Sequence, residues 1–372
     1  MNLVALNADT LALQTPLPFV LRGAQGGELL ARGQQVRDHA QLQQLAERGA
    51  GLFVDTDTCG DAYRAHLVAL GAPPTDWPAL HQYTAHLLLA EPSAQLARQL
   101  GALADHVLEQ CRRAPDAALL ALVQLSAREL RQHSATRALL VVAVTTLVAR
   151  ETLRWDAPRV ATLARAALTM NLSVTALQDR LALQSAPLKR EQIQAINAHP
   201  EQSVQLLRQM GVHDADWLEA VANHHQRVPG QLHALAPALQ MARLIQRADQ
   251  FGARIAPRTT RSPMNMSAAM QGSYYDENGQ VEEAGAALVK TLGRYPPGAC
   301  VRLISQEVGV VLRRGPTPTT PRVAVLVDRQ GLPCDAPLLR DAAHSAFKVA
   351  VCVPCHSLRV QLPLHELLGL VA

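Results

Sequence analysis

Through the central part of the chain an apolar residue recurs at every third or fourth position, with polar residues between. This spacing runs from residue 62 to about residue 131 and again from residue 133 to residue 293, with Pro or Gly in the gaps. Apolar residues spaced in this way lie along one face of an α-helix. The pattern therefore predicts a series of helices that pack through those faces.

The first sixty residues have a different pattern. The apolar run 16–23, the turn 24–27 and the run 28–36 together predict a β-hairpin. Asp38 can cap a short helix over 39–49, and residues 51–57 follow as a strand. We expect a small α/β module at the N-terminus.

The C-terminal segment changes character again after Gly298. Short β-branched runs are separated there by Gly, Pro and Asp, and they cover residues 300–304, 307–315, 322–328, 347–354 and 358–363. Such runs predict a small antiparallel sheet or barrel. The expected fold is mainly α, with a helical core between two small β-containing ends. The expected boundaries are 1–60, 61–132, 133–294 and 295–372.

Composition and charge narrow the functional classes. Aromatic residues make up only 3% of the 372 residues, so the core must consist of Leu, Ala and Val, which suits helices. A net charge of +4 without Lys/Arg blocks does not indicate a nucleic-acid polymer as partner. The longest apolar stretch, residues 138–149, is shorter than the roughly 20 residues of a membrane span. The N-terminus has no basic region typical of a secretory signal, so we expect a cytoplasmic protein without a membrane span.

Six cysteines are scattered along the chain without the spacing of a disulfide framework, and we expect them to be mostly reduced. Cys352, Cys355 and His356 match the CxxCH pattern of c-type haem attachment. Haem attachment requires export, which the N-terminus does not indicate. We interpret the match as a coincidence and the cysteines as two partly buried thiols, with a redox pair as the alternative.

The histidines are the most informative residues. His199 is followed after twenty-four residues by the pair His224–His225, and after a further twenty-three by Asp249. Imidazole and carboxylate groups on facing helices suit Zn, Fe, Mn or Ni. Pro200 is expected to open a new helical stretch. The spacing alone is a weak signal because the chain has fourteen histidines.

Five segments give the histidines a specific context. They are residues 133–156, ARAALTMNLSV at 164–174, residues 187–207, AVANHHQRVPGQLHA at 220–234 and RADQFGARIAPRTTR at 247–261. In order and spacing they resemble the HD-GYP domain, the bacterial cyclic di-GMP phosphodiesterase branch of the HD metal-dependent phosphohydrolases. The second, fourth and fifth stand where the family has the patterns AALLHDIGK, HHExxDGxGYP and ADxxDAxxxxRxYR. The resemblance implies an HD-type helical bundle with a metal site.

The residues at the family's functional positions are partly different. The first metal histidine falls on Arg137, the His-Asp pair on Met170 and Asn171, and the following Gly-Lys on Ser173 and Val174. The GYP tripeptide falls on Leu232, His233 and Ala234, and the Asp before it on Pro229. His199, His224, His225 and Asp249 remain, and Arg258 and Arg261 match the two downstream arginines as candidate phosphate contacts.

These differences predict a damaged metal site. A binuclear site needs a carboxylate bridge between two mutually repelling cations, and Asn171 is neutral. Arg137 is a permanent cation and cannot bind metal. His199, His224 and His225 can hold at most one divalent ion (Fe, Mn, Zn or Ni), and an empty polar pocket with no cofactor is at least as consistent with the sequence. Adjacent helical residues point about 100° apart, so both His224 and His225 can face the site only where the helix ends.

The loss of one metal ion would leave the negative charge of Asp249 without a neutralising cation. Asp249 would be a buried carboxylate without a counter-ion, at a cost of several kcal/mol. Arg137 occupies the lost histidine position and can present two donors to a carboxylate. We therefore predict a partly buried ion pair between Arg137 and Asp249, with Met170 beside it.

The preferred functional hypothesis is a catalytically impaired HD-GYP-like signalling or scaffold protein that binds a protein partner or a cyclic dinucleotide. The alternatives are an active metal-dependent cyclic di-GMP phosphodiesterase with an altered, mononuclear site, and a purely structural interaction module.

Overall fold

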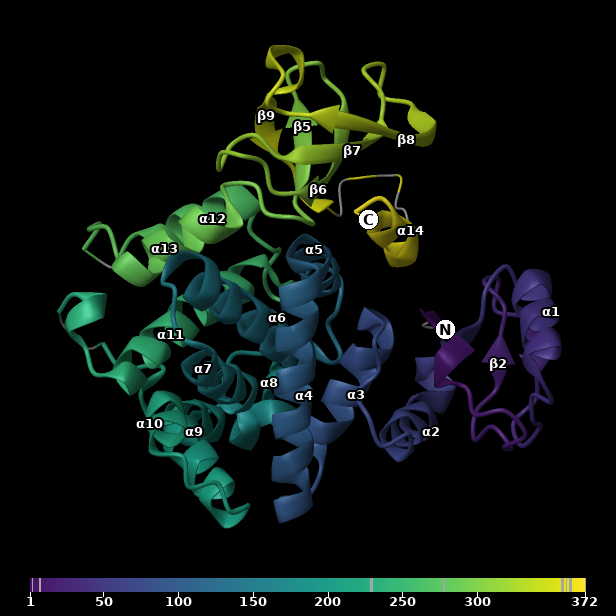
Figure 1. The fold of residues 1–372 in the computed structure, drawn as a ribbon, viewed down its shortest axis with the longest axis horizontal. Helices are drawn as coiled ribbons and strands as arrows, with labels where there is room; N and C mark the ends of the chain where they lie inside the picture. The colour runs from purple at the N-terminus through teal and green to yellow at the C-terminus, as the bar shows by residue number, and fades with distance from the viewer. Residues whose placement is uncertain are drawn as a thin grey trace. The chain divides into compact units, whose positions relative to one another are not determined.

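The computed structural model describes residues 1, 3–6, 8–227, 230–276, 278–355, 358, 360 and 363–371 (Figure 1). It divides into two compact units, Met1–Ala90 and Glu91–Ala372. The finer division into four parts stays a prediction.

The first unit is the predicted α/β module extended by two helices. Its antiparallel sheet has the order β1-β4-β2-β3. Its elements are β1 (Leu3–Ala5), η1 (Ala8–Thr10), β2 (Leu21–Arg22), β3 (Glu28–Leu30), α1 (His39–Gly49), β4 (Phe53–Asp55), α2 (Thr56–Ala69) and α3 (Trp77–Leu89). Strands β2 and β3 form the predicted hairpin, and the Asp38 carboxylate accepts a hydrogen bond from the Gln41 backbone N–H at the start of α1.

The second unit begins with a helical bundle that contains all five matched segments. The bundle consists of α4 (Ala94–Arg113), α5 (Pro115–Ser126), α6 (His133–Leu147) with the π-helical turn η2 (Val148–Thr152), α7 (Ala157–Thr169), η3 (Leu172–Val174), α8 (Thr175–Leu183), α9 (Arg190–Gln209), α10 (Ala215–Asn223), η4 (Leu232–Ala234), α11 (Pro237–Ile255), α12 (Met266–Tyr274) and α13 (Glu283–Leu292). The mainly α fold class is as predicted.

Helix α6 is the centre of this bundle. Every one of its residues is buried except Arg137, and it packs against α4, α5, α7 and α11. A helix that is apolar on all sides can only be stable inside a protein. In the described part of the chain, one segment, Ala157–Leu183, is apolar and long enough to cross a membrane. It consists of α7, η3 and α8, and 56% of its apolar window is buried, as in the core helices of globular domains.

Helix α9 corrects one expectation. Pro200 does not open a new helix, because α9 continues without a break from Arg190 to Gln209. Proline in a helix leaves the carbonyl four residues earlier without its donor. In α9 that carbonyl belongs to Ile196, and the Nδ1 atom of His199 lies 2.5 Å from it. The imidazole supplies the missing donor, so the helix is not interrupted.

The second unit ends in an antiparallel five-stranded sheet with the order β8-β7-β6-β5-β9. Its elements are β5 (Cys300–Leu303), β6 (Val308–Arg313), β7 (Arg322–Val327), β8 (Pro333–Asp341), η5 (Ser345–Phe347) and β9 (Val349–Cys352), followed by α14 (Leu364–Gly369). Strand β8 was not predicted, because proline and aspartate are rare in strands and β8 contains two of each. Proline is tolerated in β8 because this strand lies at the edge of the sheet. The predicted run 358–363 lies partly outside the described residues.

The cysteines differ from expectation. Cys300 at the start of β5 and Cys355 after β9 form a disulfide, with a Cα–Cα distance of 5.3 Å. The prediction of reduced thiols is therefore wrong for this pair, whose partners are 55 residues apart in sequence and come together only through the β5–β9 pairing. His356 of the CxxCH pattern lies outside the described residues.

Candidate active site

Two buried histidines face each other where α9 and the end of α10 meet. His199 comes from the middle of α9, and His224 directly follows α10. Their Nε2 atoms are 3.1 Å apart. The Nδ1 atom of His199 is hydrogen-bonded to the Ile196 carbonyl, and the Nδ1 atom of His224 lies 2.7 Å from the Val221 carbonyl.

These contacts determine which nitrogen carries the proton. A carbonyl oxygen only accepts hydrogen bonds, so the Nδ1 atom of each ring must be the protonated one. Both Nε2 lone pairs then point at each other, and two acceptors at this distance repel unless a cation or a proton lies between them. Burial lowers the pKa of His224 to about 3 and also lowers that of His199, which disfavours the proton. The pair is thus suited to a metal ion.

His225 completes the cluster. Helix α10 ends at Asn223, so the chain leaves helical geometry and both adjacent rings turn to the same side, as the sequence argument requires. One ligand atom from each of His199, His224 and His225 lies within 4.8 Å of the others. His225 is exposed, whereas the other two are buried. The three side chains converge with the open side of the cluster at His225.

The opposite half of the site contains the ion pair between α6 and α11. The Arg137 Nε atom donates to Asp249 Oδ1 at 2.5 Å, and its Nη2 atom donates to Oδ2 at 2.6 Å. The side chains are 12% and 4% exposed. The predicted ion pair is therefore present, and it is bidentate. Burial by itself would raise the pKa of Asp249, but the Arg137 guanidinium holds that pKa below its ordinary value.

The residues that replace the family's His-Asp pair and the following Gly-Lys have structural roles in this protein. Met170 is buried at the end of α7, and Asn171 lines the cavity described below. The Ser173 hydroxyl donates to the His199 carbonyl at 3.1 Å and also contacts the Ser203 hydroxyl. Val174, which stands at the position of the family's lysine, is buried against the same cavity. These residues provide packing and helix contacts but no second metal ligand set.

A cavity of about 610 Å³ opens beside both halves of the site. Its polar lining includes Arg137, Asn171, His199, His225 and Arg258. Its apolar lining comes from η3, α8, the following loop and α9: Val174, Leu177, Leu181, Ala186, Pro187, Leu188 and Ile196. The cavity therefore suits a ligand that has both a charged group and an apolar or flat part.

Arg258 is the cation that this cavity leaves available. Its side chain is half-buried, and within the described residues no hydrogen bond or ion pair reaches its guanidinium. Burial and then the positive charges of Arg137 and Arg261 lower its pKa. An anion in the cavity would relieve that repulsion. Arg261 is exposed and donates instead to the Ala253 carbonyl, and it does not line the cavity.

Two cavity residues were missed by the sequence argument. His133 is buried one turn before Arg137, its Nε2 atom has no hydrogen-bond partner among the described residues, and its pKa is lowered by burial to about 3. Within the same residues, the buried Oε1 atom of Gln178 on α8 is also unsatisfied. The four-residue spacing from Arg137 was the available signal for His133; nothing in the sequence indicated Gln178.

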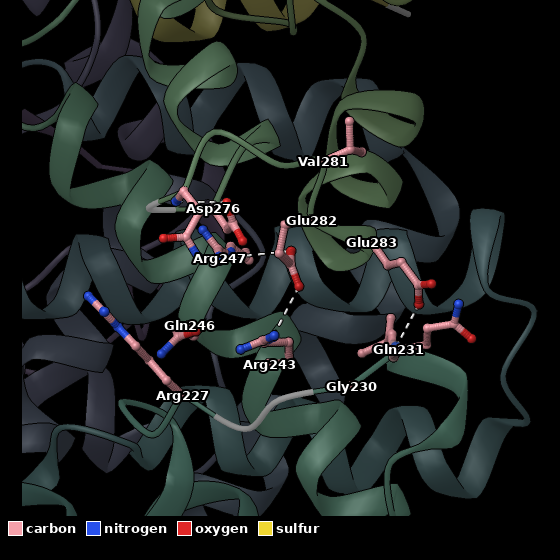
Figure 2. Close-up of a pocket in the computed structure, with 12 residues that line it drawn as sticks. Arg227, Gly230, Gln231, Arg243, Gln246, Arg247, Asp276, Val281, Glu282 and Glu283 are labelled. Atoms are coloured by element: carbon pink, nitrogen blue, oxygen red, sulfur yellow. Dashed lines mark hydrogen bonds and ion pairs between the residues drawn. The ribbon is translucent and has the colours of Figure 1, made fainter.

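A second cavity, of about 510 Å³, is lined by residues that follow His225 in the chain, by residues of α11 and by residues at and before the start of α13 (Figure 2). The Arg243 Nε atom donates to Glu282 at 3.0 Å, and Arg247 pairs with the other oxygen of the same carboxylate. Three arginines and three acidic residues line this cavity, so it has no net charge. The positions of the GYP tripeptide border it: Leu232 is buried and its N–H donates to Glu283, while Pro229 lies outside the described residues.

Comparison with known proteins finds similarity to HD domain proteins. The family model described as HD domain matches residues 117–278. The chain is 27% identical over 229 residues to the cyclic di-GMP phosphodiesterase PA4108 of Pseudomonas aeruginosa, a match that covers 60% of this chain and 54% of that protein. The chain thus spans about half the length of this curated relative. The solved structure of Bd1817, an HDG"Y"P protein from Bdellovibrio bacteriovorus, has a TM-score of 0.46 and 13% identity, over 77% of this chain and 98% of the other.

Proposed function

We propose that this chain, which is similar to HD domain proteins and to a cyclic di-GMP phosphodiesterase, is a cytoplasmic bacterial signalling or scaffold protein of the HD-GYP group that binds a cyclic dinucleotide without hydrolysing it. A protein partner in second-messenger signalling would respond to the bound state. The proposal rests on the residues of the candidate site, and above all on the ion pair of Arg137 and Asp249.

That ion pair supports the loss of hydrolysis. Two-metal phosphodiester hydrolysis needs both cations and a carboxylate that bridges them. Both oxygens of Asp249 are bonded to Arg137, and Asn171 has no charge to offer. A guanidinium in this place neutralises the carboxylate but cannot activate a water molecule.

One divalent ion fits the remaining half. HD domains are generally metal-dependent, and the opposed Nε2 atoms of His199 and His224, with His225 beside them, form a three-nitrogen ligand set. We propose Fe, Mn, Zn or Ni as the ion. It would supply positive charge next to a bound phosphate, while the carbonyls of Ile196 and Val221 keep two of the rings in the required tautomer.

The phosphate contact is assigned to Arg258, with Arg261 as a weaker, exposed contributor. A guanidinium gives charge-assisted hydrogen bonds to a phosphodiester, and among the described residues Arg258 forms no ion pair with a carboxylate. The apolar residues of the cavity, among them Leu177 and Leu181, are assigned to the remainder of the ligand.

The second candidate is an active phosphodiesterase with a mononuclear site, and the histidine cluster favours it. Metal content and hydrolysis together separate the two functions. We expect at most one equivalent of metal per chain and no conversion of cyclic di-GMP by the metal-loaded protein. Two equivalents of metal with turnover of the cyclic dinucleotide would refute the proposal.

Calorimetry tests binding directly. Arg258→Gln should weaken the binding of cyclic di-GMP by about tenfold or more, since a hydrogen bond to a charged group contributes roughly 1.5–3 kcal/mol. The matched control is Arg208→Gln, which removes an exposed arginine of α9 outside the cavity and should leave the affinity unchanged. No binding to the wild-type protein would favour a purely structural module.

A further inference from the structure

The CxxC sequence that begins at the end of β9 has no part in the proposed function, yet its second cysteine, Cys355, is cross-linked next to the helical bundle. Cys300 and Cys355 are joined by a disulfide, and Cys352 stays a buried, free thiol. The Gln124 side chain of α5 donates to the Gly298 carbonyl at 2.6 Å, and its Nε2 atom lies 3.9 Å from the Cys355 sulfur. The cross-link therefore sits directly against the bundle.

The same cross-link lies beside the loop that carries Arg258. This loop, residues 256–265, connects α11 to α12 and will be called the Arg258 loop. A small cavity is lined by both cysteines, by Pro263, Met264 and Asn265 of this loop, and by the flanking residues Ile255 and Met266. The segment 353–355 and the C-terminal part of the loop thus face the same cavity.

We infer that the Cys300–Cys355 disulfide is a redox-reversible link that orders the Arg258 loop, so that its reduction weakens anion binding at the proposed site. The inference rests on the proposed function for its ligand. It does not depend on that function for the redox step or for the change in the loop.

The two sulfurs differ in their access to a reductant. Cys355 is partly exposed, whereas Cys300 is 2% exposed. A thiolate of a small dithiol attacks the Cys355 sulfur, the S–S bond breaks, and the Cys300 sulfur leaves and takes up a proton. The second thiol of the reductant then attacks the mixed disulfide, releases Cys355 as a thiol and leaves the reductant as a disulfide. Two electrons and two protons pass to the protein.

Cys352 does not complicate this exchange. Burial raises the pKa of its thiol to about 11, so it carries almost no thiolate at neutral pH and is a poor internal nucleophile. The link therefore has two states, the Cys300–Cys355 disulfide and two free thiols. In the reduced state, the segment after β9 is no longer covalently tied to β5, and its position beside the Arg258 loop is no longer fixed.

The test compares oxidised and reduced full-length protein. Peptide mapping under non-reducing conditions should find Cys300 linked to Cys355, and dithiothreitol should open that link. Reduction should weaken cyclic di-GMP binding at least about threefold and increase amide hydrogen exchange in peptides that cover 256–265. The melting temperature should fall by roughly 5–10 °C, as expected for a cross-link that closes a long loop.

Variants make the result specific. Cys300→Ser with Cys355→Ser should behave like reduced wild-type protein and should no longer respond to dithiothreitol. Cys334→Ser, which removes a free cysteine of β8, is the matched control and should keep the full response. If the double variant fails to fold, the dithiothreitol titration of the wild type decides alone.

The outcomes separate the two proposals. Free thiols at Cys300 and Cys355 after treatment with an oxidant, or equal hydrogen exchange of the loop in both states, would overturn the redox link. If exchange rises on reduction but neither state binds cyclic di-GMP, the link stands and the proposed function fails. Equal affinity in both states with tight binding would overturn the coupling and leave the proposed function intact.

Discussion

The two halves of the candidate site handle charge in opposite ways. In the half between α6 and α11, the carboxylate of Asp249 is neutralised by Arg137, which the protein itself supplies and which donates a hydrogen bond to each of its oxygens. In the half between α9 and α10, the Nε2 atoms of His199 and His224 face each other without any donor between them. One side of the site can thus have its charge satisfied by the protein's own cation while the other side stays suited to a metal ion.

The largest expected effect comes from breaking the satisfied half. Arg137→Ala leaves Asp249 buried without a counter-charge and should lower the free energy of unfolding by about 3–5 kcal/mol, measured by urea denaturation. The control is the double variant Arg137→Met with Asp249→Leu, which removes both charges and should be far less destabilised. Equal loss in the two variants would show that packing and not charge is responsible.

Restoring the family's residues should allow both halves of the site to bind a metal ion. The triple variant Arg137→His, Met170→His and Asn171→Asp gives Asp249 a histidine neighbour and supplies a bridging carboxylate. We expect its metal content to rise from at most one equivalent per chain to two, measured by elemental analysis after dialysis. Arg137→His alone lacks the bridge and should not reach two equivalents; a second ion in that single variant would contradict the argument.

In the histidine half, the loss of metal affinity should depend on which histidine is replaced. His199→Ala removes a buried ligand and also the donor to the Ile196 carbonyl, and should abolish metal binding. His225→Ala removes only the exposed ligand and should weaken Zn²⁺ binding by a smaller factor, because the two buried ligands remain. His233→Ala, an exposed histidine away from the cluster, is the control for isothermal titration. Equal effects of all three would argue against a site here.

The smallest effect concerns pH. The guanidinium of Arg137 lowers the folded-state pKa of Asp249, so the pair stabilises the fold fully above the unfolded value of about 3.9 and loses this contribution as pH falls through the lower, folded value. Unfolding measured between pH 7 and pH 3 should therefore show an acid-dependent loss that the Arg137→Met, Asp249→Leu variant lacks. Identical pH profiles would mean that the carboxylate contributes no linked proton.

Several parts of this result could be predicted because they depend on local chemistry. Apolar residues at helical spacing predict the bundle, and α6, apolar on every side but one, can only be a central helix. The ion pair of Arg137 and Asp249 joins distant segments, and it could be predicted because the family resemblance placed both residues at one metal position and a buried carboxylate needs a cation. The end of α10 at Asn223 was required if both adjacent histidines were to face one site.

Other features were decided only by the tertiary structure, because they depend on distances between segments far apart in the chain. The disulfide needs β5 beside β9, and the opposed Nε2 atoms of His199 and His224 need α9 beside α10. The geometry of one loop decides that Arg258 lines the cavity, whereas Arg261 donates a hydrogen bond to the Ala253 carbonyl. The sequence by itself determined which groups must be buried and neutralised; the packing of the helices decided which groups meet and which are left for a ligand.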